Sequence, residues 1–137
     1  MRVVLDTNIL ISLFRFKTAS RLLDMAAERK FLMVTSPYIM GEMVRNLLKL
    51  EMPVEKVAES LVLAWNAAAV IAHPEDSLVK RIAEETGNPK DAPILAACVV
   101  TAADYLVTGE KRLLELGRYG VTRIIFLREF LSLLGEE

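Results

Sequence analysis

Short apolar runs alternate along the chain with longer segments whose apolar residues recur at helical spacing. The short runs predict five short apolar strands, at residues 2–5, 31–35, 69–72, 105–107 and 121–126. The longer segments predict helices near residues 9–14, 20–29, 77–85 and 91–103, with others beginning at 37 and 53 and a last one after 126. This alternation favours an α/β fold with a mainly parallel sheet covered on both faces, because right-handed crossovers place helices on either side.

Polar residues and prolines mark several of the predicted helix boundaries. Ser36 and Pro37 suit the start of a helix, because serine caps free N–H groups and proline fits the first helical position. Gly87-Asn88-Pro89 has the chemistry of a turn that ends a helix. Asp91-Ala92-Pro93 predicts the next helix, with Asp91 at its cap.

Four acidic residues follow the predicted strands closely or lie one or two helical turns beyond them: Asp6, Glu42, Asp91 and Glu110. In a parallel sheet such positions converge on one edge, where ligands bind outside the carboxyl ends of the strands. Clustered carboxylates raise one another's pKa and cost folding free energy unless a cation neutralises them. The pattern therefore predicts a divalent metal site and an enzyme that acts on phosphates.

Each acid also has an ordinary structural explanation when it is considered alone. Asp6 and Asp91 suit helix N-caps, and Glu110 in a first helical turn suits the helix dipole. Glu42 could be a surface charge on its helix. Their joint placement at strand ends is what favours a functional site, most strongly for Asp6 and Asp91 and least for Glu110.

Composition sets the broad class of the protein. Its 137 residues fit one domain, residues 1–137, and 53% of them are hydrophobic, a surplus that burial in a homodimer would explain. The net charge of −1 argues weakly against nucleic-acid binding. That argument loses force if bound metal ions neutralise several of the acids. The single Cys98 lies in an apolar run and excludes an intrachain disulfide, which favours a buried thiol and a cytoplasmic protein. No apolar run is long enough to span a membrane.

Other chemistry-bearing residues fit a site less well. Asp104 precedes its strand and is expected at the opposite edge of the sheet. His73 is the only histidine, and it has no sequence partner that would suggest a catalytic triad. Asp6-Thr7-Asn8 is similar to the aspartate motif of haloacid-dehalogenase-like phosphatases, but Asn8 stands where that mechanism needs a second aspartate.

Four motifs together point to one family. They are Val-Val-Leu-Asp-Thr-Asn-Ile-Leu-Ile-Ser at 3–12, Ser-Pro-Tyr-Ile-Met-Gly-Glu at 36–42, Asp-Ala-Pro-Ile-Leu-Ala-Ala at 91–97, and Ala-Asp-Tyr-Leu-Val-Thr-Gly-Glu-Lys-Arg-Leu-Leu at 103–114. In this order and spacing they resemble a PIN-domain nuclease of the small single-domain prokaryotic type, which includes VapC-like toxins. The resemblance implies a three-layer α/β/α sandwich with a five-stranded sheet of order 3-2-1-4-5. It also implies an endoribonuclease that depends on Mg²⁺ or Mn²⁺.

The resemblance also assigns roles to individual residues. Asp6 matches the family's first metal-binding aspartate, Glu42 its helix glutamate, and Asp91 the aspartate that opens the helix before the fourth strand. Glu110 departs from the pattern, because relatives usually have aspartate there. Its extra methylene changes the reach of the carboxylate, which puts a second metal in doubt.

Polar and basic residues near the acids are the expected supporting groups. Asn8 and Thr108 match polar positions that line the family's site. Cations close to the acidic motifs could hold phosphates of single-stranded RNA, and they are Arg15, Lys17, Arg45, Lys90, Lys111 and Arg112. The resemblance further implies cleavage that leaves a 5′ phosphate and a 3′ hydroxyl.

Three functional hypotheses follow from the sequence. The first is an active metal-dependent ribonuclease, which as a toxin would be restrained by an antitoxin whose arginine enters the acidic pocket. The second is an inactive PIN-fold module that binds nucleic acid or protein, for which Glu110 is the only hint. The third is an interaction protein that uses the apolar helix around Leu61, Leu63 and Trp65, a surface that would also suit a homodimer.

Overall fold

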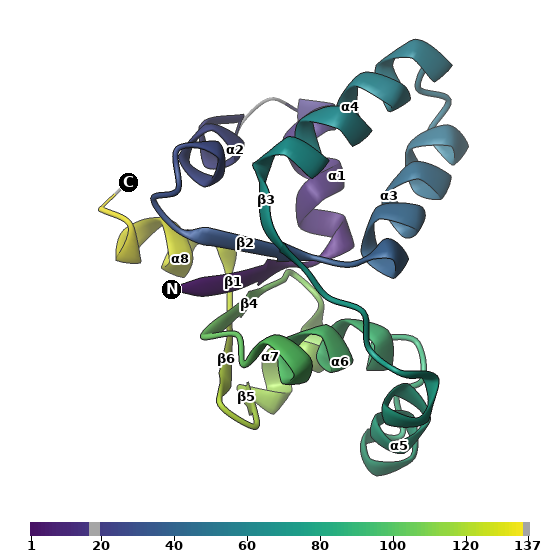
Figure 1. Cartoon of the computed structure of the whole chain (residues 1–137), viewed down its shortest axis with the longest axis vertical. Helices are drawn as coiled ribbons and strands as arrows, with labels where there is room; N and C mark the ends of the chain where they lie inside the picture. Colours follow the sequence, from purple (N-terminus) through teal and green to yellow (C-terminus); the bar gives the residue numbers. More distant parts are fainter. Residues whose placement is uncertain (17–19, 136–137) are drawn as a thin grey trace.

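The computed structural model describes residues 1–16 and 20–135, and it forms a mixed α/β architecture (Figure 1). The first half contains β1 (Arg2–Leu5), α1 (Thr7–Phe16), α2 (Ser20–Ala27), β2 (Leu32–Thr35), α3 (Pro37–Lys49), α4 (Val54–Ala67) and β3 (Ala68–Ile71). The second half contains α5 (Asp76–Thr86), α6 (Ala92–Thr101), β4 (Tyr105–Val107), α7 (Lys111–Leu116), β5 (Arg118–Tyr119), β6 (Thr122–Ile125) and α8 (Leu127–Leu133).

The sheet has the order β3-β2-β1-β4-β6-β5, and the first five strands in this order are parallel. These five are the predicted strands, and their predicted order of 3-2-1-4-5 is confirmed. The sixth strand, β5, was not predicted, and it pairs antiparallel with β6. Its two residues are too few to show a hydrophobic period, and the hairpin turn depends on Gly120 at a positive φ of 59°.

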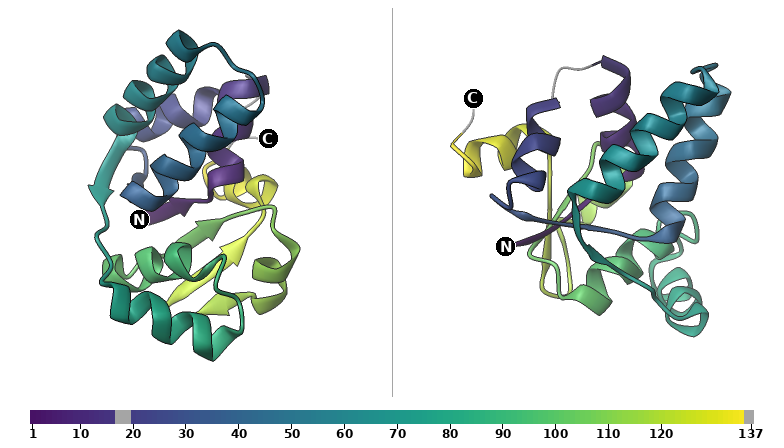
Figure 2. Two further views of the ribbon diagram at one scale, coloured as in Figure 1. Left: turned by 90° about the vertical axis from the view of Figure 1, so that its right-hand side faces the viewer. Right: turned by 45° about the horizontal axis from the view of Figure 1, so that its top comes forward.

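Helices cover both faces of the sheet, which confirms the three-layer prediction. Helices α1 to α4 lie on one face, and α5, α6 and α7 lie on the other (Figures 1 and 2). The central strand β1 supplies Val3, Val4 and Leu5, which are all fully buried. Burial on both faces explains why Val3 to Leu5 form a continuous apolar run that does not alternate with polar residues, whereas the edge strand β3 is partly exposed.

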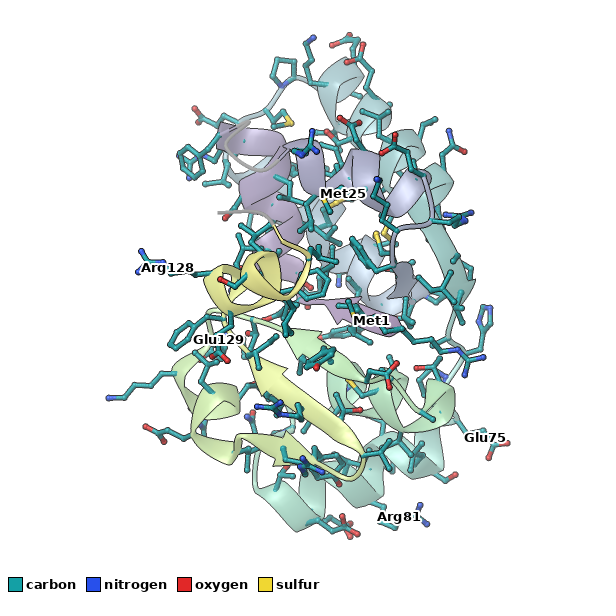
Figure 3. The ribbon with its side chains drawn as sticks, turned by 90° about the vertical axis from the view of Figure 1, so that its left-hand side faces the viewer. Met1, Met25, Glu75, Arg81, Arg128 and Glu129 are labelled. Atoms are coloured by element: carbon teal, nitrogen blue, oxygen red, sulfur yellow. The ribbon has the colours of Figure 1, made fainter. Side chains whose placement is uncertain are left out.

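The last helix, α8, closes the core beyond the final strand. The ring of Phe130 is fully buried and meets the ring of Phe31 edge to face, with centroids 5.0 Å apart. Figure 3 shows Met25 inside the molecule, whereas Arg128, near the start of α8, points outward. Through Phe130 the helix therefore packs one apolar face against the core.

Hydrogen bonds between loop backbones hold the carboxyl ends of the strands side by side. The N–H of Asp6 donates to the carbonyl of Val107 at 3.0 Å, and the N–H of Thr108 donates to Ile125 at 3.1 Å. The residues that follow β1 and β4 are thus placed next to each other. Asp104 lies at the opposite edge, as predicted, where its carboxylate accepts from the N–H of Arg2 at 2.8 Å.

Candidate functional site

The carboxyl edge of the sheet contains a polar cleft of about 300 Å³. Five of the six predicted site residues line it: Asp6, Asn8, Glu42, Asp91 and Glu110. The other residues that line it are Thr7, Tyr38, Asn46, Lys49, Lys90 and Ile94. The structure therefore brings together side chains that are up to 104 positions apart in the sequence, from Asp6 to Glu110.

Asp6 lies at the bottom of this cleft, directly after β1. Only 4% of its surface is exposed, and its carboxylate accepts hydrogen bonds from the N–H of Thr7 and the hydroxyl of Thr108, both at 2.7 Å. Burial raises the pKa of Asp6 above its ordinary value of 3.8, although these two hydrogen bonds lower it. The negative charges of Asp91 and Glu110 raise it further. The carboxylate is thus rigidly held in a place where a nearby cation would stabilise it.

Asp91 occupies the N-cap position of α6, yet its side chain makes no capping hydrogen bond. Its carboxylate instead accepts from the amide of Asn88 at 2.7 Å, and its own N–H donates to the Asn88 side-chain oxygen at 3.3 Å. The residue is 6% exposed. A capping role therefore explains where Asp91 lies but not what its carboxylate does. The carboxylate is held by Asn88, and Asp91 lines the cleft.

Glu42 projects into the cleft from the second turn of α3. This helix begins as predicted, because the Ser36 hydroxyl accepts from the N–H of Ile39 at 3.2 Å and Pro37 occupies the first turn. Two residues on the next turn contact the Glu42 carboxylate. Arg45 forms an ion pair with it at 3.5 Å, and the amide of Asn46 lies 3.4 Å from its other oxygen.

Thr108 and Glu110 connect the end of β4 to the cleft. Thr108 is fully buried beneath Asp6. It was predicted to line the site, but it is not among the residues that line the cleft. Its hydroxyl donates to Asp6 and accepts from the N–H of Glu110 at 2.9 Å, so it couples the two acids. The Glu110 side chain makes no capping hydrogen bond at the start of α7 and lines the cleft.

The donor set fits a hard divalent cation. Within the described residues, no three acidic, histidine or cysteine side chains form a ready metal-binding group. Mg²⁺ does not require one, because it usually takes one or two carboxylates and keeps several waters. Asp6 and Asp91 supply two such carboxylates, and the buried Thr7 hydroxyl in the same cleft lining has no hydrogen-bond partner in the part of the chain that the structure describes. This orphaned oxygen suits a water bound to a metal ion.

Sequence reasoning missed several residues of the cleft. Tyr38, Asn46 and Lys49 line it on the same helix as Glu42, at a helical spacing that could have identified them. Asn88 supports Asp91 from three residues upstream. Burial beside Glu42 raises the pKa of Tyr38 to about 12, so its hydroxyl stays protonated and can donate a hydrogen bond at neutral pH.

Only some of the predicted phosphate-binding cations lie near the cleft. Lys90 lines the cleft, and Arg45 contacts it through Glu42. Arg15 lies over the ring of Phe16 at 5.0 Å. Lys17 lies outside the described residues, and Lys111 and Arg112 begin α7 without lining the cleft. Only part of the expected basic surface therefore faces the acids.

Comparison with known proteins agrees with this arrangement. In its fold the chain resembles PAE2754 from Pyrobaculum aerophilum, with 19% identity, a TM-score of 0.72, and coverage of 98% of this chain and 96% of that one. Comparison with curated proteins finds no match. A family model described as PIN domain matches residues 2–112, a stretch that contains all four acids and the strands that carry them. The chain therefore belongs to the PIN domain family and has a nuclease-type fold.

Proposed function

We propose that the protein is an endoribonuclease that depends on Mg²⁺ or Mn²⁺ and hydrolyses phosphodiester bonds of single-stranded or structured RNA. The observation that supports this most is the convergence of Asp6, Glu42, Asp91 and Glu110 on one cleft. The raised pKa of Asp6 shows that burial already disfavours its charge in the absence of a cation.

Asp6 and Asp91 are the residues that would hold the ion. When bound, a divalent ion polarises a phosphate, lowers the pKa of a bound water and stabilises the departing oxygen. Thr108 and Asn88 fix the two carboxylates by hydrogen bonds of 2.7 Å each, so that the ligands need little reorganisation. Glu42 orients the attacking water by accepting a hydrogen bond from it.

Nucleic acid enters this site as a strand whose phosphates must approach four acids. Lys90, next to Asp91, supplies one positive charge at the cleft wall. A single strand exposes its backbone and bases more fully than a duplex does, which suits a cleft at the surface. We infer an RNA substrate in the cytoplasm, with products that carry a 5′ phosphate and a 3′ hydroxyl.

This proposal is tested with purified protein and a set of end-labelled single-stranded RNAs in Mg²⁺, Mn²⁺ or a chelator. We expect cleavage with either ion and none with the chelator. An assay of the product ends by a 5′-phosphate-dependent exonuclease checks the polarity of the cut. Absence of cleavage across RNAs of varied sequence would leave the alternative hypothesis, an inactive PIN-fold module that binds nucleic acid or protein.

Glu110 is expected to assist the same reaction. The Glu110→Gln variant is expected to lower the cleavage rate by about tenfold, since it removes one charge near Asp6 but spares both proposed ligands. Glu110→Asp is the matched control, because it keeps the charge and restores the residue usual in relatives. The two rates are compared over a Mn²⁺ titration. Equal rates for wild type and Glu110→Gln at every concentration would exclude a role for Glu110 in the reaction.

We propose further that the chain forms a homodimer through α4. On this helix Leu63 is 56% exposed and Trp65 is 37% exposed, whereas Leu61 is half-buried. A second copy of the chain would remove these side chains from water. Light scattering should give the mass of a dimer for wild type and of a monomer for Leu63→Glu. Val121→Glu, at an exposed position outside α4, should remain dimeric, and a monomeric wild type would refute the proposal.

The resemblance to VapC-like toxins supports one more proposal, that the nuclease is the toxin of a toxin–antitoxin pair. An arginine from an antitoxin would be neutralised by the acids of the cleft and would block it. A small adjacent reading frame for a DNA-binding protein is expected in the genome. Its absence, together with normal growth of cells that express the wild-type protein, would contradict this role.

A further inference from the structure

Helix α3 carries a polar stripe that extends the cleft away from the acids. Tyr38, Glu42, Asn46 and Lys49 are spaced by four, four and three residues, which places them on one face of the helix. All four line the same cleft. The helix begins beside the end of β2 and runs away from the sheet (Figure 1). The cleft is therefore elongated along α3, with Lys49 at its far end.

Lys49 is placed at a defined distance from the acids. It is seven residues beyond Glu42, which corresponds to about 10 Å along the helix axis. Its side chain is exposed, and among the described residues no acid forms an ion pair with it. Arg45 differs, because its guanidinium is already paired with Glu42 at 3.5 Å. Lys49 therefore offers a cationic group that no acid of residues 1–16 or 20–135 engages in an ion pair.

Helix stability explains only part of this arrangement. Lys49 is the last residue of α3, where a positive charge interacts favourably with the helix dipole. That effect would be the same on any face of the helix. It does not account for a lysine on the one face that carries Glu42 and lines the cleft.

The charge of Lys49 suits the binding of a polyanionic strand. Four acids at one end of the cleft repel a polyanion, so a strand needs cations at points removed from the acids as well as a metal among them. Lys90 precedes Asp91 in the sequence and lines the cleft, and Lys49 lines it from the last residue of α3. A strand that follows the stripe would place one phosphate at the acids and a later one at Lys49.

We propose that Lys49 binds a backbone phosphate of the RNA strand about one to three nucleotides from the scissile bond, a spacing set by the rise of α3. Asn46 lies between the two points and also contacts the Glu42 carboxylate at 3.4 Å. The inference rests on the proposed function for the nature of the strand. On one side of the scissile bond the RNA strand would then run along α3.

Binding and cleavage are separated in the test by a reference variant, Asp91→Asn, which is expected to bind RNA without cutting it. Affinity for a fluorescent single-stranded RNA is measured by anisotropy in Mg²⁺ over a range of salt concentrations. Adding Lys49→Gln should weaken binding by about 5- to 10-fold and reduce the salt slope by about one. Lys56→Gln is the control, because Lys56 lies on α4 and pairs with Glu59.

A second series locates the contact. RNAs in which one phosphate at a time is replaced by a neutral methylphosphonate are bound to the reference and to its Lys49→Gln derivative. We expect one position at which neutralisation weakens the reference but leaves the derivative unchanged. Losses that are equal at all positions, unchanged affinity and salt slope in the derivative, or no RNA binding by the reference would overturn the proposal. A coupled position in a protein whose wild type never cleaves would support the subsite and refute the nuclease function.

Discussion

The Asp6→Asn variant is expected to lose at least about 100-fold in RNA cleavage, because a removed metal ligand forfeits several kcal/mol of charge stabilisation in the transition state. The same change is expected to leave the fold intact. Asparagine has nearly the same shape, its oxygen can accept from the N–H of Thr7, and its amide can donate to the Thr108 hydroxyl. Loss of activity in a folded protein would therefore report on the site.

The variant is also expected to be at least as stable as wild type when no divalent ion is present. Burial raises the pKa of Asp6 in the folded state above its ordinary value of 3.8. The stability that this group contributes is therefore fully present below pH 3.8 and is lost as the pH rises through the folded-state pKa. At pH values well above 3.8 the raised pKa of Asp6 therefore makes this group destabilise the metal-free fold, and asparagine removes that pH-dependent cost.

Thermal unfolding in chelator at several pH values measures this effect beside the cleavage assay. The midpoint for Asp6→Asn should equal or exceed that of wild type at pH 7, and its advantage should disappear at strongly acidic pH. Asp24→Asn, on the exposed side of α2, is the control and should change neither cleavage nor stability. A strongly destabilised Asp6→Asn protein would mean that Asp6 serves the fold and not the reaction.

The Phe130→Ala variant is expected to lose about 3–5 kcal/mol of unfolding free energy, the usual cost of removing a buried aromatic ring. Phe130 is fully buried, stacks edge to face on Phe31, and lies 6.5 Å from the ring of Tyr105. It also lies beyond residues 2–112, the part that the family model matches. The variant thus tests whether α8 belongs to the same cooperative unit as the site.

Urea denaturation followed by circular dichroism gives the unfolding free energy for this comparison. Leu133→Ala, which removes a side chain that is 54% exposed on the same helix, should cost much less than 1 kcal/mol. A loss below about 1 kcal/mol for Phe130→Ala would indicate that α8 is only loosely attached to the core.

The sequence predicted the central strands β1, β2 and β4 well because they are largely buried. Val3, Val4 and Leu5 form an uninterrupted apolar run that ends at a polar residue, and such ends place Asp6 without any knowledge of tertiary contacts. Glu42 could also be predicted from local sequence, because the Ser36 cap fixes where α3 begins and hence which turn carries the glutamate.

Other features depend on contacts that no local pattern reveals. The role of Asn88 arises from a turn that folds its amide onto Asp91, and the burial of Thr108 arises because the end of β4 lies beneath Asp6. The two-residue strand β5 is too short to have a period. Lys49 was overlooked because a lysine at the end of a helix has an ordinary explanation, and only the cleft distinguishes it from a surface charge.

The central claim is that the acids of this cleft make a metal-dependent nuclease. The most direct measurement is cleavage of one single-stranded RNA by wild-type protein and by Asp91→Asn, in Mn²⁺, after chelation, and after Mn²⁺ is restored. Wild type should cut only when the ion is present, recover activity when the ion is returned, and leave 5′-phosphate ends, while Asp91→Asn should be inert throughout. Cutting that persists in chelator, or that is equal in the two proteins, would contradict it.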